Sequence, residues 1–406
     1  MTWNHRYQLK TYLRSSLWII PLFALLFEQV AGALAQTLDT HLGWEGLGFG
    51  VTGAQALLNA IITLTLSFIV FTFGSLLIAI QVASGQYTPR IIATTLLRDN
   101  VIRYTVGLFV FTFLFAIKAL DRTETSVHQL EAFVVGLLGL ICIVAFLFLI
   151  DYAARMLRPV SLVRRVGEYG LEVIKSVYPE QSTEAQSIAA SQQIPGPVER
   201  IILHRGKSAI VVAANVQALV AEAEKAKGVI EFAPQVGDFV GPGEPLFLLH
   251  DGAGTVYERK LRASVVLGDE RTMEQDPLFA FRILVDIAIK ALSKAINDPT
   301  TAVLAIDQLH RLLRSAGRRN LRTDQILDRD WKLRVIFRTP NWEDFVHLAF
   351  TEIRFYGAEN MQIARRLRAM IVNLRIHYRR NVILPYAKNS SCWIVRSRSS
   401  MFYPRI

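Results

Sequence analysis

A group of acidic, amide and guanidinium side chains lies between about residues 270 and 300. Two pairs in it, Asp276-Pro277 and Asp298-Pro299, each precede an apolar helical pattern. An aspartate followed by proline is typical of a helix N-terminus, because the carboxylate caps free N–H groups and proline suits the first turn. The same groups, gathered around the turn between two helices, could instead hold an ion or a phosphate. The candidate residues for such a coupling or ligand site are Arg271, Glu274, Asp276, Asp286, Asn297 and Asp298.

A second candidate is a line of polar side chains within the apolar run from Ala56 to Ala83, which contains no charged residue. At 3.6 residues per turn these side chains fall on one side of a helix. Such a stripe could line a water-filled path, but small and hydroxylated residues also let membrane helices approach one another closely. The lack of ionisable side chains in the run favours packing. The candidate polar face consists of Asn59, Thr63, Ser67 and Gln81.

The third candidate is the segment SGQYTPR, which follows that run and contains Gln86, Pro89 and Arg90. Pro89 lacks a backbone donor and restrains the residue before it, so a bend is expected. Arg90 should then lie near the lipid headgroups, within reach of a phosphate or of a carboxylate. We expect Arg90 to couple the membrane spans to an acidic residue of the following domain, one of Glu274, Asp276 and Asp286. Anchoring of Arg90 to lipid is the alternative.

Sequence signatures of catalysis and of metal binding are missing from the chain. It has no P-loop, nucleophile elbow, HExxH or dinucleotide-binding glycine pattern. Its eight histidines are scattered, and its two cysteines, Cys142 and Cys392, cannot form a disulfide framework or a cysteine metal site. We therefore predict a protein that is not an enzyme and that holds no metal or cofactor.

Four apolar segments are long enough to cross a bilayer, which takes about 20 apolar residues. Lysine and arginine gather before the first, between the second and third, and after the fourth. The positive-inside rule therefore places both termini in the cytoplasm. The same residues, which can attract anionic lipid headgroups, account for much of the net charge of +11. No recognition motif accompanies the charge, so no nucleic acid is expected as a partner.

The remainder of the chain is predicted to be a charged cytoplasmic region attached to these spans. The phrase VGDFVGPGEPLFLL resembles the hairpins of lipoyl- and biotinyl-type domains, without their displayed lysine. The predicted fold is an integral membrane α-helical protein with four transmembrane helices, followed by a cytoplasmic α+β domain with a small barrel-sandwich-like β part and a helical part. The predicted divisions are a transmembrane domain at 1–155 (helices about 17–35, 56–83, 104–120 and 130–150), an amphipathic helix and linker at 156–197, a β-rich subdomain at 198–268, a helical subdomain at 269–380 and a disordered or aberrant tail at 381–406.

Five motifs occur between residues 15 and 378: SGQYTPRII, RTMEQDP, LVDIAIKALSKAINDPTTA, TPNWED and IRFYG. Together with four N-terminal spans they resemble a bacterial family of predicted membrane proteins, catalogued as a domain of unknown function. The resemblance implies a location in the bacterial inner membrane and brings no activity, substrate or catalytic residue. Lys294 departs from it, since the family commonly has proline there. The motif residues map onto Gln86, Pro89, Arg90, Arg271, Glu274, Asp276, Pro277, Asp286, Asn297, Asp298 and Pro299.

Two function classes remain open. The first is a channel or transport-type protein with a cytoplasmic regulatory domain, which would be a homo-oligomer because four spans are too few for a roomy monomeric pore. The alternative is a non-transporting sensor or scaffold whose cytoplasmic domain binds a ligand or partner. An oligomeric structure would discriminate best: a central path lined by Thr63, Ser67 and Gln81 would favour the first class, and a solid apolar bundle would favour the second.

Reporter fusions test the predicted topology. A reporter that is active only in the periplasm should be active when joined at Gly48 and inactive when joined after Arg158, because the basic residues retain their flanks in the cytoplasm. The opposite pattern of activity would contradict the four-span arrangement.

Overall fold

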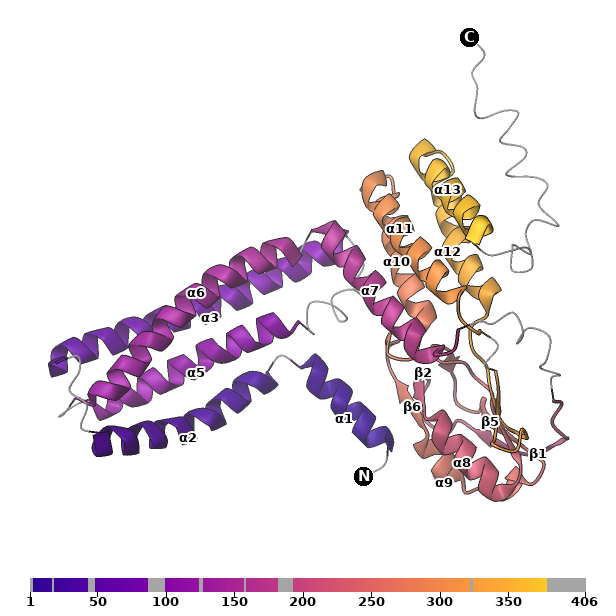
Figure 1. The fold of residues 1–406 in the computed structure, drawn as a ribbon, viewed down its shortest axis with the longest axis horizontal. Helices are drawn as coiled ribbons and strands as arrows, with labels where there is room; N and C mark the ends of the chain where they lie inside the picture. Colours follow the sequence, from indigo (N-terminus) through magenta and orange to yellow (C-terminus); the bar gives the residue numbers. More distant parts are fainter. Residues whose placement is uncertain are drawn as a thin grey trace, which may run out of the picture. The chain divides into compact units, whose positions relative to one another are not determined.

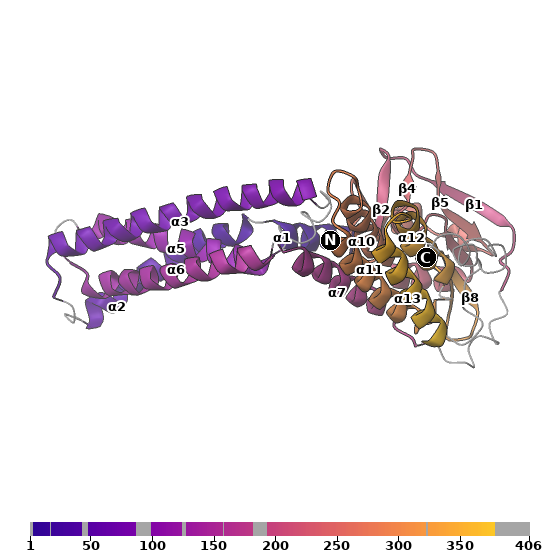
Figure 2. The ribbon, with the colours of Figure 1, turned by 90° about the horizontal axis from the view of Figure 1, so that it is seen from above.

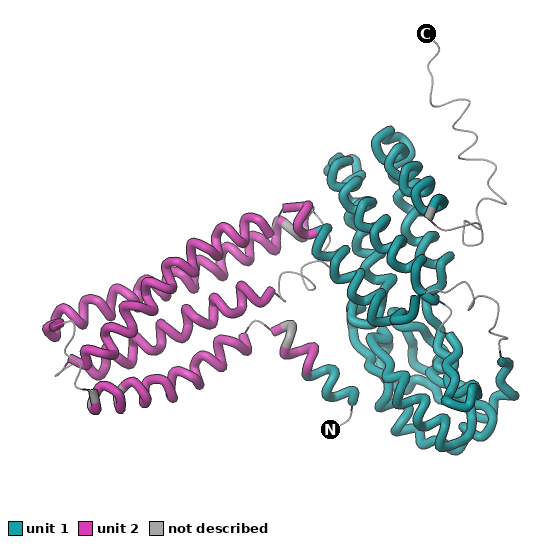
Figure 3. The backbone as a smooth tube through the Cα atoms, viewed as in Figure 1, with its two compact units in different colours: residues 1–9, 163–406 teal, residues 10–162 magenta. Residues whose placement is uncertain are grey.

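The computed structural model describes residues 3–16, 18–42, 48–86, 99–123, 127–156, 158–181, 193–321 and 324–377. Its helices and strands are drawn in Figure 1 and, turned by 90°, in Figure 2. The chain divides into two compact units (Figure 3). Residues 10–162 form one, the helical unit, and residues 1–9 with 163–406 form the other, the α/β unit. The predicted tail at 381–406 lies outside the described residues.

The helical unit contains four helices that are long and apolar enough to cross a membrane. An apolar cluster around Leu58, Phe115 and Val135 fills the space between three of them. The four segments predicted to be spans are thus helices of sufficient length. The second, third and fourth extend beyond both predicted bounds, and the first begins two residues later and ends seven residues later than predicted. They are α2 (Ile19–Leu42), α3 (Val51–Gln86), α5 (Asn100–Arg122) and α6 (Gln129–Met156).

A helix that the sequence did not predict, α1 (Trp3–Ser15), precedes these spans. Its first residues group with the α/β unit. There the rings of Trp3 and Tyr7 pack against Val212, Ala213 and Val266. The sequence did not predict this helix because most of its residues are polar or charged and its apolar face is short.

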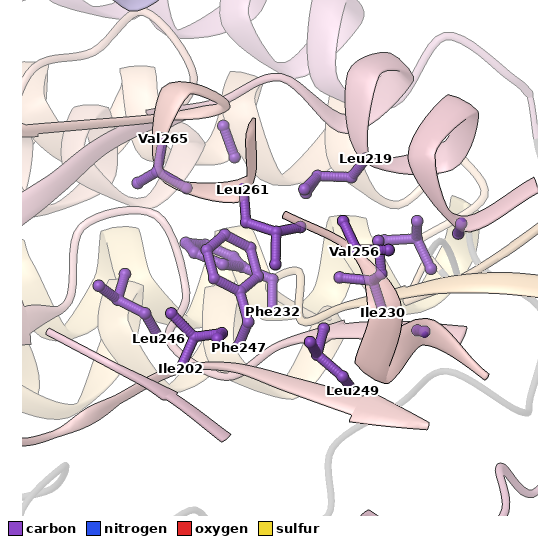
Figure 4. Close-up of a cluster of buried hydrophobic side chains, with 14 of the residues drawn as sticks. Ile202, Leu219, Ile230, Phe232, Leu246, Phe247, Leu249, Val256, Leu261 and Val265 are labelled. Carbon is purple, nitrogen blue, oxygen red and sulfur yellow. The ribbon is translucent and has the colours of Figure 1, made fainter. Parts of the chain in front are cut away.

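The α/β unit has two sheets around one apolar core, with strand orders β1-β5-β3-β8-β7 and β4-β2-β6. All strand pairs are antiparallel except β3 with β8, in which Ile230 lies opposite Val335. Figure 4 shows Phe232, Phe247 and Leu261 converging in this core. The strands are β1 (Val198–Leu203), β2 (Ala209–Ala214), β3 (Val229–Phe232), β4 (Phe239–Val240), β5 (Pro245–His250), β6 (Val265–Gly268), β7 (Gln325–Leu327) and β8 (Leu333–Phe337).

Strands β7 and β8 come from the part of the chain predicted to be a helical subdomain. They are short and flanked by charged residues, so neither has a clear periodicity in the sequence. Because β8 pairs with β3, residues 269–380 do not form a separate helical part. This region is a mixed α/β structure.

Five helices of this unit begin at side chains that accept hydrogen bonds from first-turn N–H groups: Asn215, Asp276, Asp298, Asn341 and Asn360. Such caps stabilise a helix by about 1 kcal/mol each. The helices are α7 (Pro159–Val177), α8 (Val216–Ala226), η2 (Ala253–Thr255), α9 (Glu258–Ala263), α10 (Pro277–Ala291), α11 (Pro299–Ala316), α12 (Trp342–Tyr356) and α13 (Met361–His377). The ring centroids of Phe281 in α10 and Phe345 in α12 are 4.9 Å apart, so these two helices pack through aromatic side chains.

His310 connects α11 to α13. Its Nδ1 accepts a hydrogen bond from Arg366 Nη2 at 3.0 Å, and its Nε2 donates to Asn373 Oδ1 at 2.9 Å. The first bond requires the neutral ring, because a protonated Nδ1 cannot accept, whereas the second can be made by either form of the ring. Burial lowers the pKa of His310 below its usual range, and the charges of Arg366 and Arg314 lower it further, while Asn373 and Asp307 act in the opposite direction.

The stability of the α/β unit should therefore depend on pH through His310. As the pH falls below about 6.5, the unfolded chain binds the His310 proton before the folded chain does, so the stability present above that pH is lost. Thermal unfolding of the full chain in detergent between pH 7.5 and pH 5.5 measures this loss. His310→Gln should show a smaller decrease in Tm over the same range. Equal decreases in the two proteins would contradict this role.

Candidate functional site

Asp276 and Arg271 form a largely buried ion pair at the start of α10. Asp276 Oδ2 accepts hydrogen bonds from Arg271 Nε at 2.9 Å and Nη2 at 2.6 Å, while Oδ1 accepts from the Phe279 N–H at 3.0 Å. Only 2% of Asp276 is exposed. Burial raises the pKa of Asp276, and the nearby Arg271 guanidinium opposes that shift. The carboxylate is thus fully occupied as a helix cap and as an ion-pair partner.

The turn at Gly237 covers this ion pair. Gly237 has a φ of +95°, and a Cβ added there would lie 2.4 Å from Asp276 Oδ2 and 2.6 Å from Arg271 Nη2. A side chain would therefore meet both unfavourable backbone geometry and a direct clash. The Val236-Gly237-Asp238 turn, which the sequence suggested belongs to a hairpin, is held against the start of α10.

Two other residues of the RTMEQDP motif contact different elements. The backbone N–H of Ala214, at the end of β2, donates to Gln275 Oε1 at 3.0 Å. Glu274 lies beside Tyr7 of α1. Burial raises the pKa of the Tyr7 phenol well above its usual range, and interaction with Glu274 raises it further. The motif thus joins α1, β2, the Gly237 turn and α10.

Asp286 lies near the middle of α10 and is paired within the same helix. Arg282 Nη2 contacts Asp286 Oδ1 at 2.7 Å and also donates to Glu352 Oε2 of α12 at 3.0 Å. The hydrogen bond with Arg282 lowers the pKa of Glu352. These contacts pin α10 to α12.

Asn297 and Asp298 follow the other end of α10. Asp298 Oδ1 accepts from the Thr301 N–H at 3.0 Å, and Oδ2 accepts from the Thr301 hydroxyl at 2.5 Å. These bonds lower the pKa of Asp298. Asn297 is exposed and has a left-handed φ of 48°, which asparagine tolerates.

The candidate residues of the α/β unit therefore do not surround one turn, as we expected. Asp276 caps the start of α10, whereas Asn297 and Asp298 come after its end. The 15-residue helix between them is about 22 Å long. In the part of the chain that the structure describes, no group of three His, Cys, Asp or Glu side chains could hold a metal ion.

The predicted coupling through Arg90 is not tested by these contacts. Pro89 and Arg90 lie outside the described residues, and Gln86 is the last residue of α3. Of the acidic residues suggested as partners, Asp276 and Asp286 already have arginine partners within the α/β unit. Coupling of the two units through Arg90 stays a prediction.

The candidate polar face of α3 lies on the outside of the helical unit. Asn59, Thr63, Ser67 and Gln81 are all exposed, whereas Leu58 is fully buried. The Thr63 hydroxyl donates to the Asn59 carbonyl at 2.9 Å, and the Ser67 hydroxyl donates to the Thr63 carbonyl at 2.7 Å. The polar face therefore does not pack against another helix of the same unit. Packing between helices of one copy, the simplest explanation for these polar residues, does not account for them.

Buried ion pairs at one end of the helical unit had no clear signal in the sequence. Lys118 of α5 contacts Glu28 of α2 at 3.2 Å, and Arg122 contacts Glu131 of α6 at 2.8 Å. Arg122 Nη1 also donates to the Gly32 carbonyl at 3.2 Å. Both carboxylates are 2% exposed. The only sequence signal was the position of Glu28 inside an apolar run.

Four helices long and apolar enough to cross a membrane, joined to a folded α/β unit, are the features expected of a multi-span membrane protein. Over residues 14–373 the chain matches the family described as "Predicted membrane protein (DUF2254)" and belongs to it. It is also similar to uncharacterised proteins of Mycobacterium bovis and Mycobacterium tuberculosis, with 24% identity over 375 residues, covering 87% of this chain and 71% of each relative. No solved structure matches the chain.

The two Asp-Pro caps should differ in their effect on stability. Asp298→Ala should cost about 1 kcal/mol through loss of a cap. Asp276→Ala should cost more, about 3 kcal/mol, because it also removes the charge-assisted hydrogen bonds with the partly exposed Arg271 guanidinium. Urea unfolding of the full chain in detergent, monitored through hydrogen exchange of the α10 backbone, compares the free energies of unfolding of the two variants. Equal destabilisation would contradict the buried-pair assignment.

Proposed function

We propose that the protein is a homo-oligomeric channel or transport-type protein of the bacterial inner membrane, in which the α3 helices of neighbouring copies face one another. The observation that supports this proposal is the exposure of Asn59, Thr63 and Ser67 on the outer face of a long apolar helix. Both termini lie in the cytoplasm by the positive-inside rule, and the α/β unit regulates the assembly there.

A second copy is the natural cover for this face. A lipid-facing helix surface is normally apolar, as on α6, where Leu140, Val144 and Leu147 are each more than 60% exposed. An amide in hydrocarbon without a partner costs several kcal/mol. Gly74 lies on the same side of α3, and a Cβ added there would meet nothing within 4 Å. Small residues allow a neighbouring helix to approach closely.

The path would run between copies and not through one copy. Within the helical unit, Leu58, Ile61, Phe115 and Val135 fill the space between the helices. This apolar cluster leaves the α3 face as the polar surface that several copies can bring together. No catalytic step is assigned, since the acidic motif residues serve as caps and ion-pair partners.

The alternative, a sensor or scaffold that transports nothing, has a specific observation in its favour. Helix α1 directly precedes the first span, and its Tyr7 lies beside Glu274 and packs on β2 and β6. Binding of a partner to the α/β unit could therefore shift the N-terminal segment without any path opening.

Cysteine substitution separates these possibilities. In a Cys392→Ser background, Ser67→Cys should cross-link between copies in native membranes, and Leu140→Cys on α6, an exposed control, should not. Absence of cross-linking at Ser67, with normal insertion of the protein, would contradict the proposed assembly.

Reaction with a charged, membrane-impermeant thiol reagent then tests for the path. Thr63→Cys and Ser67→Cys should react if α3 lines a water-filled route between copies, because thiolates form only in water. Cross-linking without any such reaction would favour the sensor or scaffold.

A further inference from the structure

Helix α13 has an apolar inner face and an unusual outer one. Ile363, Leu367, Met370 and Leu374 are buried against the neighbouring helices of the α/β unit. On the opposite side, Arg365, Arg368 and Arg375 are exposed and, among the described residues, form no ion pair. The helix contains no acidic residue.

Apolar side chains lie among these arginines. Met361 is 56% exposed, Val372 49% and Ile376 71%. At 100° per residue they fall on the same side of α13 as the arginines. We call this surface the basic face of α13; it consists of Met361, Arg365, Arg368, Val372, Arg375 and Ile376.

The turn into α13 adds aromatic surface next to this face. Phe355 is 78% exposed and Tyr356 is 53% exposed, both in the last turn of α12, and a short turn separates them from Met361. Aromatic and aliphatic side chains interspersed with arginine are typical of helices that lie in the interface of an anionic membrane. The acidic residue in this segment is Glu359, within the turn.

We propose that the basic face of α13 docks on the surface of an anionic phospholipid membrane. Charge complementarity selects this partner: arginines attract anionic headgroups while the exposed apolar side chains enter the headgroup boundary. The chain is itself a multi-span membrane protein, so such a surface is always near. A second copy of the same face would place arginine against arginine and is disfavoured. This inference does not depend on the assembly proposed for α3.

Spin labelling of the full chain in lipid nanodiscs tests the proposal. A nitroxide at Val372→Cys, in a Cys392→Ser background, reports collisions with a water-soluble nickel chelate and with membrane-dissolved oxygen. The collision rate with the chelate should be roughly fivefold or more lower in phosphatidylglycerol discs than in phosphatidylcholine discs, and the collision rate with oxygen should be higher. The reason is that several arginines near an anionic surface favour the bound state more than tenfold. Added salt at about 0.5 M should reverse part of the change, since it shortens the screening length to a few ångströms.

Charge-reversal variants supply the matched controls. Arg365→Glu/Arg368→Glu/Arg375→Glu should abolish the lipid effect. Lys207→Glu/Arg259→Glu/Lys332→Glu, which makes the same change of charge at exposed sites elsewhere, should retain it. A label at Tyr257→Cys, an exposed site of 74%, should respond to neither lipid.

Equal aqueous collision rates at Val372→Cys in the two lipids would overturn the proposal, whatever the variants do. Protection of that label by single-stranded RNA in phosphatidylcholine discs, with no effect of phosphatidylglycerol, would overturn it in favour of a nucleic-acid surface.

Discussion

The lack of water in bilayer hydrocarbon is the constraint on which the structure of the helical unit depends, because every polar group there must find a partner within the protein. Thr63 and Ser67 meet it locally, by donating to carbonyls one turn earlier. Glu28 and Glu131 meet it across helices, through Lys118 and Arg122. The outer face of α3 does not meet it within one copy, since the side chains of Asn59 and Gln81 are exposed. These exposed polar side chains are the observation from which the proposed contact between copies is argued.

The α/β unit depends on a different interaction, the buried pair of Arg271 and Asp276. The pair stabilises the start of α10 and fills the space beneath the Gly237 turn, while the preceding residues of the same motif contact β2 and α1. A short motif thus joins strands, helices and the N-terminal segment. These contacts give Arg271 and Asp276 a structural role in the α/β unit.

Local features of the fold could be predicted from the sequence, and long-range ones could not. The caps Asp276, Asp298 and Asn341 follow from residue type and spacing, and the four long helices follow from apolar length. Strand β8 was missed because its pairing with β3 joins residues about 100 apart. The candidate site was wrongly gathered around one turn, because the sequence shows that α10 exists but not that its length separates Asp276 from Asp298. Ion pairs such as Arg122 with Glu131 depend on which helices are neighbours, and spacing carries little of that information.

The proposed function depends on α3 of one copy facing α3 of another. Pulsed electron–electron double resonance measures the distance between nitroxides on two copies, with a single nitroxide per chain, and so tests this contact most directly. With the label at Ser67→Cys in a Cys142→Ala/Cys392→Ser background, in lipid at low protein density, we expect a defined distance between copies. That distance should be shorter than the one measured from the same label at Leu140→Cys in the same background. No dipolar coupling at Ser67, or a shorter distance at Leu140, would contradict it.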